Sequence, residues 1–193
     1  SLRLTTLDGM IRPHASASQI ETWLDAVRNL EPRFRELTCA RLPAETQTLR
    51  ARLAAGQTLD DVLPEALALC REAAHRYLYT RPYDVQVMAA IALHQGNIIE
   101  MADGEGKTLV AALAACLNAL SGQSVHVVAT SDDFARREMG WMEPVYQGLG
   151  LSAGLIQGGM PVHLRETAYV CDVIYGSDTE FAFDYLRDNL RTL

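Results

Sequence analysis

The sequence contains no run of apolar residues long enough to cross a membrane, because no window approaches the ~20 consecutive apolar positions that a spanning helix needs. Its first residues also lack a basic region followed by an apolar one, which is the pattern of a secretory signal peptide. Neither a membrane span nor an export signal is therefore predicted. We expect a cytoplasmic protein.

Paired cysteines and clustered histidines are absent as well. The cysteines never form a C-x-x-C pair and stand far apart, at Cys39, Cys70, Cys116 and Cys171. The histidines have no histidine partner four residues away and no neighbouring cysteine, and they stand at His14, His75, His94, His126 and His163. This spacing disfavours a zinc site or a redox pair and is typical of a reducing compartment. We expect all four cysteines to be small buried hydrophobic residues.

Basic residues are scarce relative to acidic ones. The chain has 17 Lys and Arg against 24 Asp and Glu, a net charge of −7. A surface devoted to nucleic acid needs clustered basic residues, so constitutive DNA or RNA binding is not expected, although a local basic groove stays open as an alternative. With 49% hydrophobic and 21% charged residues over 193 positions, the chain is predicted to be globular, with one domain or one and a half.

The first eighty residues carry helical patterns. Apolar residues recur at helical spacing at Ile20, Trp23, Leu24, Val27 and Leu30, and again through residues 58–79. The second stretch opens with Thr58, whose hydroxyl suits a helix N-cap, and with two aspartates in the first turn. Pro64 lies inside it and would kink the helix or move its start later. We expect residues 1–80 to form an N-terminal helical segment.

From residue 97 onward, short β-rich runs alternate with helical ones. Strands are expected near 98–101, 124–129, 153–157 and 171–175, with helices to about 120, to about 148 and from about 178. This alternation predicts an α/β fold with a parallel sheet and crossover helices. Ligands of such sheets bind outside the carboxyl ends of the strands.

A glycine-rich loop follows the first of these strands and opens a helix. It reads Gly104, Glu105, Gly106, Lys107 and Thr108. Glycines let a backbone fold tightly and bring several N–H groups to one point, where the positive end of the next helix adds its partial charge. Lys107 would reach the β- and γ-phosphates of a nucleotide, and the Thr108 hydroxyl would bind the Mg²⁺ that bridges them.

The loop departs from the full phosphate-loop pattern at one position. G-x-x-x-x-G-K-[ST] asks for glycine at position 101, where this chain has Met101. A plain glycine turn is the alternative to a phosphate site. The strand before the loop and the helix after it favour phosphate binding.

Several segments taken together resemble the SecA family, whose members are ATPase motors of bacterial protein export. The main ones are RPYDVQ at 81–86, EMADGEGKT at 100–108 and FAFDYLRDN at 181–189. The likeness covers roughly residues 45 to 190 in the family's order. It implies that residues 81–193 form part of a RecA-like nucleotide-binding domain, preceded by the helical segment 1–80.

The resemblance also implies roles for particular residues. Gln86 matches the glutamine that reads the adenine edge, so the cofactors would be ATP or ADP with Mg²⁺. Arg81 and Tyr83 lie close to Gln86 in the sequence and would pack on the base. The family carries Met at the place of Met101, which weakens the objection to the loop. Implied partners are a secretory preprotein and the SecYEG channel, with an anionic membrane surface at the inner face of the cytoplasmic membrane.

Some positions differ from the family. Asp103 stands where the family usually has Thr, and a carboxylate there would repel a polyphosphate unless it turned to solvent or to Mg²⁺. The family's Asp-Glu pair, which holds Mg²⁺ and activates water, comes after an insertion that would follow the 181–189 segment; this chain reaches Leu193. We therefore expect weak nucleotide binding at most and negligible hydrolysis by these 193 residues. A stand-alone binding or regulatory module without ATPase activity, or a fragment of a DEAD-like RNA helicase, are the alternatives.

Overall fold

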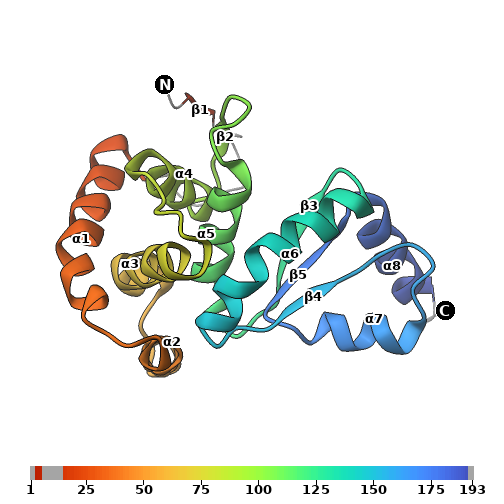
Figure 1. The fold of residues 1–193 in the computed structure, drawn as a ribbon. Coiled ribbons are helices and arrows are strands. Elements are labelled where there is room, and N and C mark those ends of the chain that lie inside the picture. Colours follow the sequence, from red (N-terminus) through yellow and green to blue (C-terminus); the bar gives the residue numbers. More distant parts are fainter. Residues whose placement is uncertain (1–2, 6–14, 191–193) are drawn as a thin grey trace.

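The computed structural model of the chain describes residues 3–5 and 15–190. The helices are α1 (Ala17–Arg35), α2 (Leu42–Ala54), α3 (Leu59–Leu78), α4 (Asp84–His94), α5 (Lys107–Ala119), α6 (Asp132–Gly148), α7 (Val162–Tyr169) and α8 (Asp178–Leu190). The strands are β1 (Arg3–Thr5), β2 (Ile98–Glu100), β3 (Val125–Ala129), β4 (Ala153–Leu155) and β5 (Val173–Ser177). Helices α1 to α4 gather on one side and the parallel strands on the other, with α5 between them and α6 lying along the sheet (Figure 1).

The predicted helices of the first eighty residues are confirmed. Helix α1 begins after Ser16, whose hydroxyl accepts a hydrogen bond from the Gln19 backbone N–H at 3.2 Å. Helix α3 begins after Thr58, which forms a capping box with Asp61. Pro64 lies inside α3 without moving its start. One face of each helix is buried, so local capping and tertiary packing agree on where these helices lie.

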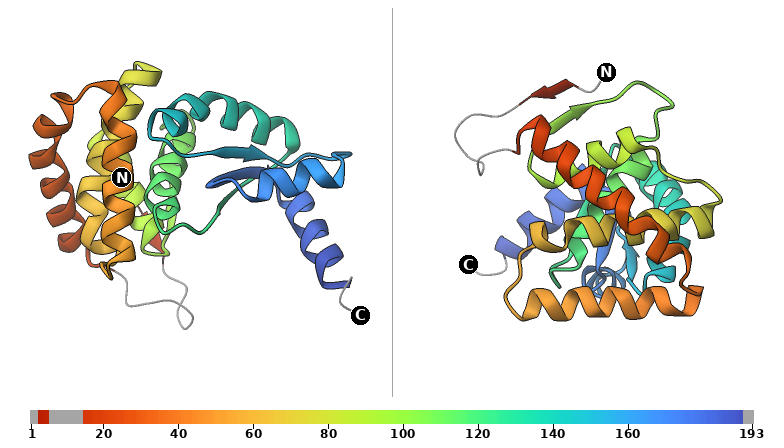
Figure 2. Two further views of the ribbon diagram at one scale, coloured as in Figure 1. Left: turned by 90° about the horizontal axis from the view of Figure 1, so that it is seen from below. Right: turned by 90° about the vertical axis from the view of Figure 1, so that its left-hand side faces the viewer.

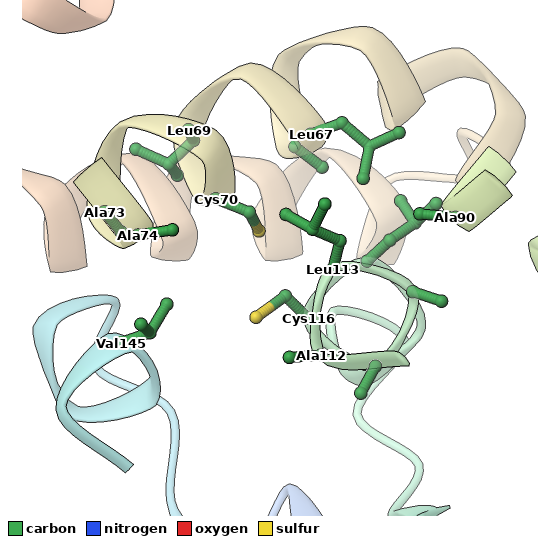
Figure 3. Packing of buried hydrophobic residues seen from close by; sticks show 14 of the residues in the cluster. Leu67, Leu69, Cys70, Ala73, Ala74, Ala90, Ala112, Leu113, Cys116 and Val145 are labelled. Carbon is green, nitrogen blue, oxygen red and sulfur yellow. The ribbon is translucent and has the colours of Figure 1, made fainter. Parts of the chain in front are cut away.

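Helix α5 is anchored in the centre of the core. Its buried residues include Leu113 and Cys116, which face Cys70 and its neighbours on α3, with Val145 of α6 close by (Figure 3). Many of the contacting side chains are alanines, and such small residues let helices approach closely. The amino end of α5, and with it the glycine loop, is thus fixed by a packed helix.

Three strands form the predicted parallel sheet, in the order β3-β5-β4. Val173 of β5 pairs with Val125 of β3 on one side and with Ala153 of β4 on the other. Helix α6 packs on one face, and α7 and α8 lie on the opposite face (Figure 2). This sheet with its crossover helices confirms the predicted RecA-like fold class, in which every residue of the central strand β5 is buried.

The strand before the glycine loop differs from expectation in its partner. Strand β2 forms where predicted, but it pairs antiparallel with β1, so that Ile99 lies opposite Leu4. It does not join the parallel sheet, in which β3 pairs only with β5 among the described strands. The physical reason is that a strand must satisfy its backbone N–H and C=O groups, and Arg3–Thr5 provides that partner for β2.

Other expectations need correction. Helices α4 and α7 were not predicted, and β5 lies two residues later than expected. Cys70 and Cys116 are buried as expected, but Cys39 is exposed and Cys171 is intermediate, so the expectation of four buried cysteines is wrong for those two. Among the helices of the described residues, none combines the length and apolar character that crossing a bilayer requires.

Candidate functional site

The glycine loop connects β2 to α5 by a backbone that two glycines make possible. Gly104 has a φ of 83° and Gly106 a φ of 84°, both in the left-handed region that side chains disfavour. Gly106 is the N-cap residue of α5, and the Glu105 side chain accepts a hydrogen bond from the Ala102 backbone N–H at 2.8 Å. The result is a tight turn at the amino end of a 13-residue helix, where the helix dipole is positive.

Gln86 ties this loop to the first turn of α4. Its Nε2 donates to the Glu105 carbonyl oxygen at 2.8 Å, and its Oε1 accepts from the Tyr83 backbone N–H at 2.8 Å. Gln86 is buried, and a Cβ on Gly106 would lie 2.4 Å from its Nε2. The amide thus holds the loop, and it keeps one further N–H and one lone pair for another partner.

Lys107 points to a neighbouring acid. Its Nζ donates to Asp103 Oδ1 at 2.8 Å, and both side chains are exposed. The hydrogen bond from Lys107 lowers the pKa of Asp103, so this carboxylate is ionised at neutral pH. The carboxylate that we expected to oppose a polyphosphate is therefore paired with the loop's own cation.

Thr108 contacts an acid on another helix. Its Oγ1 donates to Glu138 Oε1 of α6 at 3.0 Å, across 30 positions of sequence. The predicted site residues thus fall into two groups. Gln86 and the glycines set the backbone conformation of the loop, while Lys107 and Thr108 supply polar side chains at the start of α5. Their role in binding nucleotide stays a prediction.

A hollow of about 250 Å³ opens beside the loop. It is lined by Tyr83, Val85, Gln86, Glu100, Met101, Gly104 and Glu105. Its walls are mostly apolar, and its polar residues are Gln86, Glu100 and Glu105, a mixture that is typical of small-molecule sites. A second hollow of about 380 Å³ shares Glu100 and Met101 with it and reaches Lys107.

Arg71 was missed by sequence reasoning and braces the segment that carries Gln86. It is buried on α3, and its guanidinium donates to the Pro82 carbonyl oxygen at 2.7 Å, to Asp84 at 2.8 Å and to Glu31 at 2.6 Å. Glu31 also pairs with Arg81, so Arg81 points to α1, and it is not among the residues that line the hollow. The available signal was a lone arginine inside the apolar face of α3.

Metal ligands outside the loop are not assembled in the described part of the chain. No group of three or more His, Cys, Asp or Glu residues there is placed to hold a metal ion. His94 contacts Asn118 and Asp60, and His126 stacks on Phe181 with ring centroids 4.7 Å apart. His14 lies outside the described residues.

The helical segment, the parallel sheet with flanking helices and the loop at the start of α5 define a DEAD-like domain of the RecA-type fold. The family model described as SecA DEAD-like domain matches residues 8–193. The chain therefore belongs to the SecA family. The resemblance inferred from the sequence is confirmed.

Individual relatives support the same assignment. The protein translocase subunit SecA of Desulforudis audaxviator is 52% identical over 172 residues, which is 89% of this chain and 19% of that protein. The SecA of Rubrobacter xylanophilus is 50% identical over 173 residues, 90% of this chain and 19% of that protein. SecA 1 of Rhodopirellula baltica is 47% identical over 174 residues, 90% of this chain and 14% of that protein. The chain thus spans about a fifth or less of these curated relatives.

Proposed function

We propose that this chain is the ATP-binding portion of a SecA-type preprotein translocase motor. In this proposal, residues 81–193 are part of the nucleotide-binding domain and residues 1–80 are a helical segment that braces it. The names of the relatives, protein translocase subunits, support the assignment to export. The loop at the amino end of α5 supports the assignment to nucleotide binding.

The observation that carries the proposal is the hydrogen bond between Gln86 and Glu105. It joins a glutamine suited to reading a base to a glycine loop suited to holding phosphate, at 2.8 Å. The hollow of about 250 Å³ lies against the same residues. A base site and a phosphate site in this order are what a nucleoside polyphosphate requires, and a plain glycine turn would need neither the glutamine nor the hollow.

The residues present fit Mg²⁺-nucleotide. The α5 amino end and its glycines would hold phosphate, Lys107 would neutralise phosphate charge, and the Thr108 hydroxyl would hold Mg²⁺. Tyr83 and Val85 would cover the base, and Gln86 would use its remaining donor and acceptor on the adenine edge. ATP bound there supplies a phosphoanhydride bond whose hydrolysis would drive export. Lys107 must leave Asp103 to serve phosphate.

The proposal extends to partners and location. We infer a secretory preprotein as the transported substrate, a SecYEG-type channel as the docking partner, and the inner face of the cytoplasmic membrane, with anionic lipid, as the place of work. The support for these inferences is the membership in the SecA family. They concern the whole translocase rather than the loop alone.

One feature of the sequence makes nucleotide binding easy to test. Lys107 is the only lysine among the 193 residues, because the other basic residues are all arginine. An amine-reactive acylating reagent therefore modifies Lys107 and the chain's α-amine alone, and peptide mass spectrometry separates the two. We expect Mg-ADP to protect Lys107 and leave the α-amine rate unchanged. Equal rates with and without Mg-ADP would contradict the proposal.

The second measurement is the increase in the free energy of unfolding that bound nucleotide causes. Mg-ADP at 100 times its Kd should raise the free energy of unfolding by about 2.7 kcal/mol, and Lys107→Ala should abolish most of this gain. Lys107→Arg is the matched control, because it keeps the charge but changes the shape of the head group. An unchanged gain in Lys107→Ala would show that nucleotide binds elsewhere.

A further inference from the structure

The hydroxyl of Thr108 is held differently from those of threonines in the interior of the other helices. Thr179, which like Thr108 is the second residue of its helix, donates to the adjacent Asp178. Four threonines within α1, α2 and α7 donate to the carbonyl oxygen four residues earlier in their own helix, and they are Thr22, Thr46, Thr48 and Thr167. Thr108 stands at the second position of α5, so the residue four positions earlier is Gly104 of the loop. Its hydroxyl instead donates across to Glu138 of α6 at 3.0 Å.

Within the described residues, the Glu138 carboxylate has no ion pair that would compete with this hydrogen bond. Among the ion pairs of the described residues, none includes Glu138. The neighbouring Arg137 lies over the Phe134 ring, with its guanidinium carbon 4.3 Å from the ring centroid. The carboxylate of Glu138 thus meets a hydroxyl proton, and such charge-assisted hydrogen bonds are stronger than neutral ones.

We propose that Glu138 is a positioning residue for the metal ion of the nucleotide site. A hydroxyl has one proton and two lone pairs, and a cation can bind only a lone pair. Because Glu138 takes the proton, both lone pairs of Thr108 Oγ1 are left without a competing hydrogen and can serve Mg²⁺. A carboxylate behind a metal-binding hydroxyl also makes its oxygen a better ligand. This inference rests on the proposed function and adds α6 to the site.

The inference predicts a defect that depends on Mg²⁺. The quantity to measure is the magnesium enhancement, defined as the Kd for ADP in EDTA divided by the Kd for ADP in Mg²⁺, obtained by calorimetric titration of the full chain. Glu138→Ala should lower the enhancement about 10-fold or more, the size typical for lost partners of metal ligands. Glu138→Gln keeps an acceptor oxygen and should retain part of it. The Kd in EDTA should stay near the wild-type value.

Controls separate positioning from folding. Glu143→Gln changes an acid of the same helix that contacts Gln147, and it should leave the enhancement unchanged. Thr108→Val should remove the enhancement, and Thr108→Ser should keep it. Thermal unfolding of each variant checks that the fold is intact.

The outcomes distinguish the two proposals. Wild-type protein that binds ADP with a magnesium enhancement, together with Glu138→Ala that keeps this enhancement, overturns the positioning role and leaves the proposed function standing. An equal loss of affinity in EDTA and in Mg²⁺ assigns Glu138 a purely structural role and also overturns the inference. Wild-type protein that binds no ADP in either condition overturns the proposed function and the inference with it.

Discussion

The side-chain nitrogen of Gln86 donates to the backbone carbonyl oxygen of Glu105 at 2.8 Å, which joins the first turn of α4 to the glycine loop. The same amide accepts from the Tyr83 N–H at 2.8 Å, so its two ends bridge two backbone segments. Gly106 leaves just enough room for this bridge, since a Cβ there would lie 2.4 Å from Gln86 Nε2. The loop conformation therefore depends on a glycine and a glutamine together.

Gly106→Ala should damage the loop in two ways. Its φ of 84° is left-handed, which costs a residue with a side chain about 1–2 kcal/mol, and the new methyl group would displace Gln86. We expect ADP affinity to fall at least 10-fold by calorimetry, together with a lower free energy of unfolding. Gly122→Ala is the control, because it has a similar φ of 78° and no atom within 4 Å. Equal ADP affinity in both variants would contradict this account.

A second prediction concerns two tyrosines buried between α6 and β5. The hydroxyls of Tyr146 and Tyr175 lie 2.7 Å apart, and both residues are fully buried. Burial raises the pKa of Tyr146 well above its ordinary value, so this hydroxyl stays protonated. Removing one hydroxyl leaves the other without its partner, which costs about 1–3 kcal/mol. Tyr146→Phe and Tyr175→Phe should each lower the free energy of unfolding in urea by this amount.

The double variant provides the sharper test. With both hydroxyls gone, no polar group is left unsatisfied, so Tyr146→Phe with Tyr175→Phe should cost less than the sum of the single changes, by about 1 kcal/mol. Tyr185→Phe is the control, since Tyr185 is 69% exposed and should change stability little. Strict additivity of the two single changes would show that the hydroxyls do not depend on each other.

Features of the fold that depend on neighbouring residues could be predicted from the sequence. The start of α3 follows from Thr58 and Asp61, three positions apart, and the glycine loop follows from a strand, two glycines and a helix within about a dozen residues. The parallel sheet followed from the alternation of strands and helices. In each case the information lies within a short window of the chain.

Features that depend on distant residues could not be predicted. Arg71 meets Glu31 across 40 positions, and Thr108 meets Glu138 across 30. Nothing local tells which acid a buried arginine or a threonine will face. The prediction of the partner of β2 failed for the same reason, because Arg3–Thr5 lies more than ninety residues away in the sequence. Contacts of this kind depend on which distant segments the fold brings together, and a short window of sequence does not contain that information.

Asp132 gives a prediction on pH. Its carboxylate accepts from the Gly158 backbone N–H at 2.6 Å and from the Ser177 hydroxyl at 2.7 Å, at the carboxyl ends of β4 and β5. The hydrogen bond from Gly158, and then that from Ser177, lowers the pKa of Asp132 below its usual value. Because the folded pKa is the lower one, the stabilisation is complete above the unfolded value of about 3.9 and is lost as the pH falls through the folded pKa.

Asp132→Asn tests this dependence on pH. The variant should be less stable by about 1 kcal/mol at pH 7, after allowance for solvent screening, and the difference from wild type should shrink below about pH 4. Urea unfolding across pH 3 to 7 measures it. Asp133→Asn is the matched control, because Asp133 is exposed and, within the described residues, Arg136 is the basic residue with which it forms an ion pair. A difference for Asp132→Asn that stays constant with pH would contradict the assignment.

The last prediction concerns Asp103, the acid that stands beside the only lysine. Lys107 must exchange the Asp103 carboxylate, 2.8 Å away, for phosphate if the loop binds nucleotide. An exposed ion pair of this kind contributes little because solvent screens it, and the freed carboxylate would then repel the phosphate across the loop. Asp103 should therefore weaken nucleotide binding rather than prevent it.

Asp103→Thr should strengthen Mg-ADP binding about 3- to 10-fold, because it removes both the competing partner of Lys107 and the repelling charge. Asp103→Asn should give a similar gain if charge is the cause. The gain should shrink in 1 M NaCl, where the Debye length is about 3 Å and exposed charges are screened. Asp133→Asn removes the same charge from α6 and should leave the Kd unchanged. Weaker binding by Asp103→Thr at low salt would mean that Asp103 holds Lys107 ready for phosphate instead of competing with it.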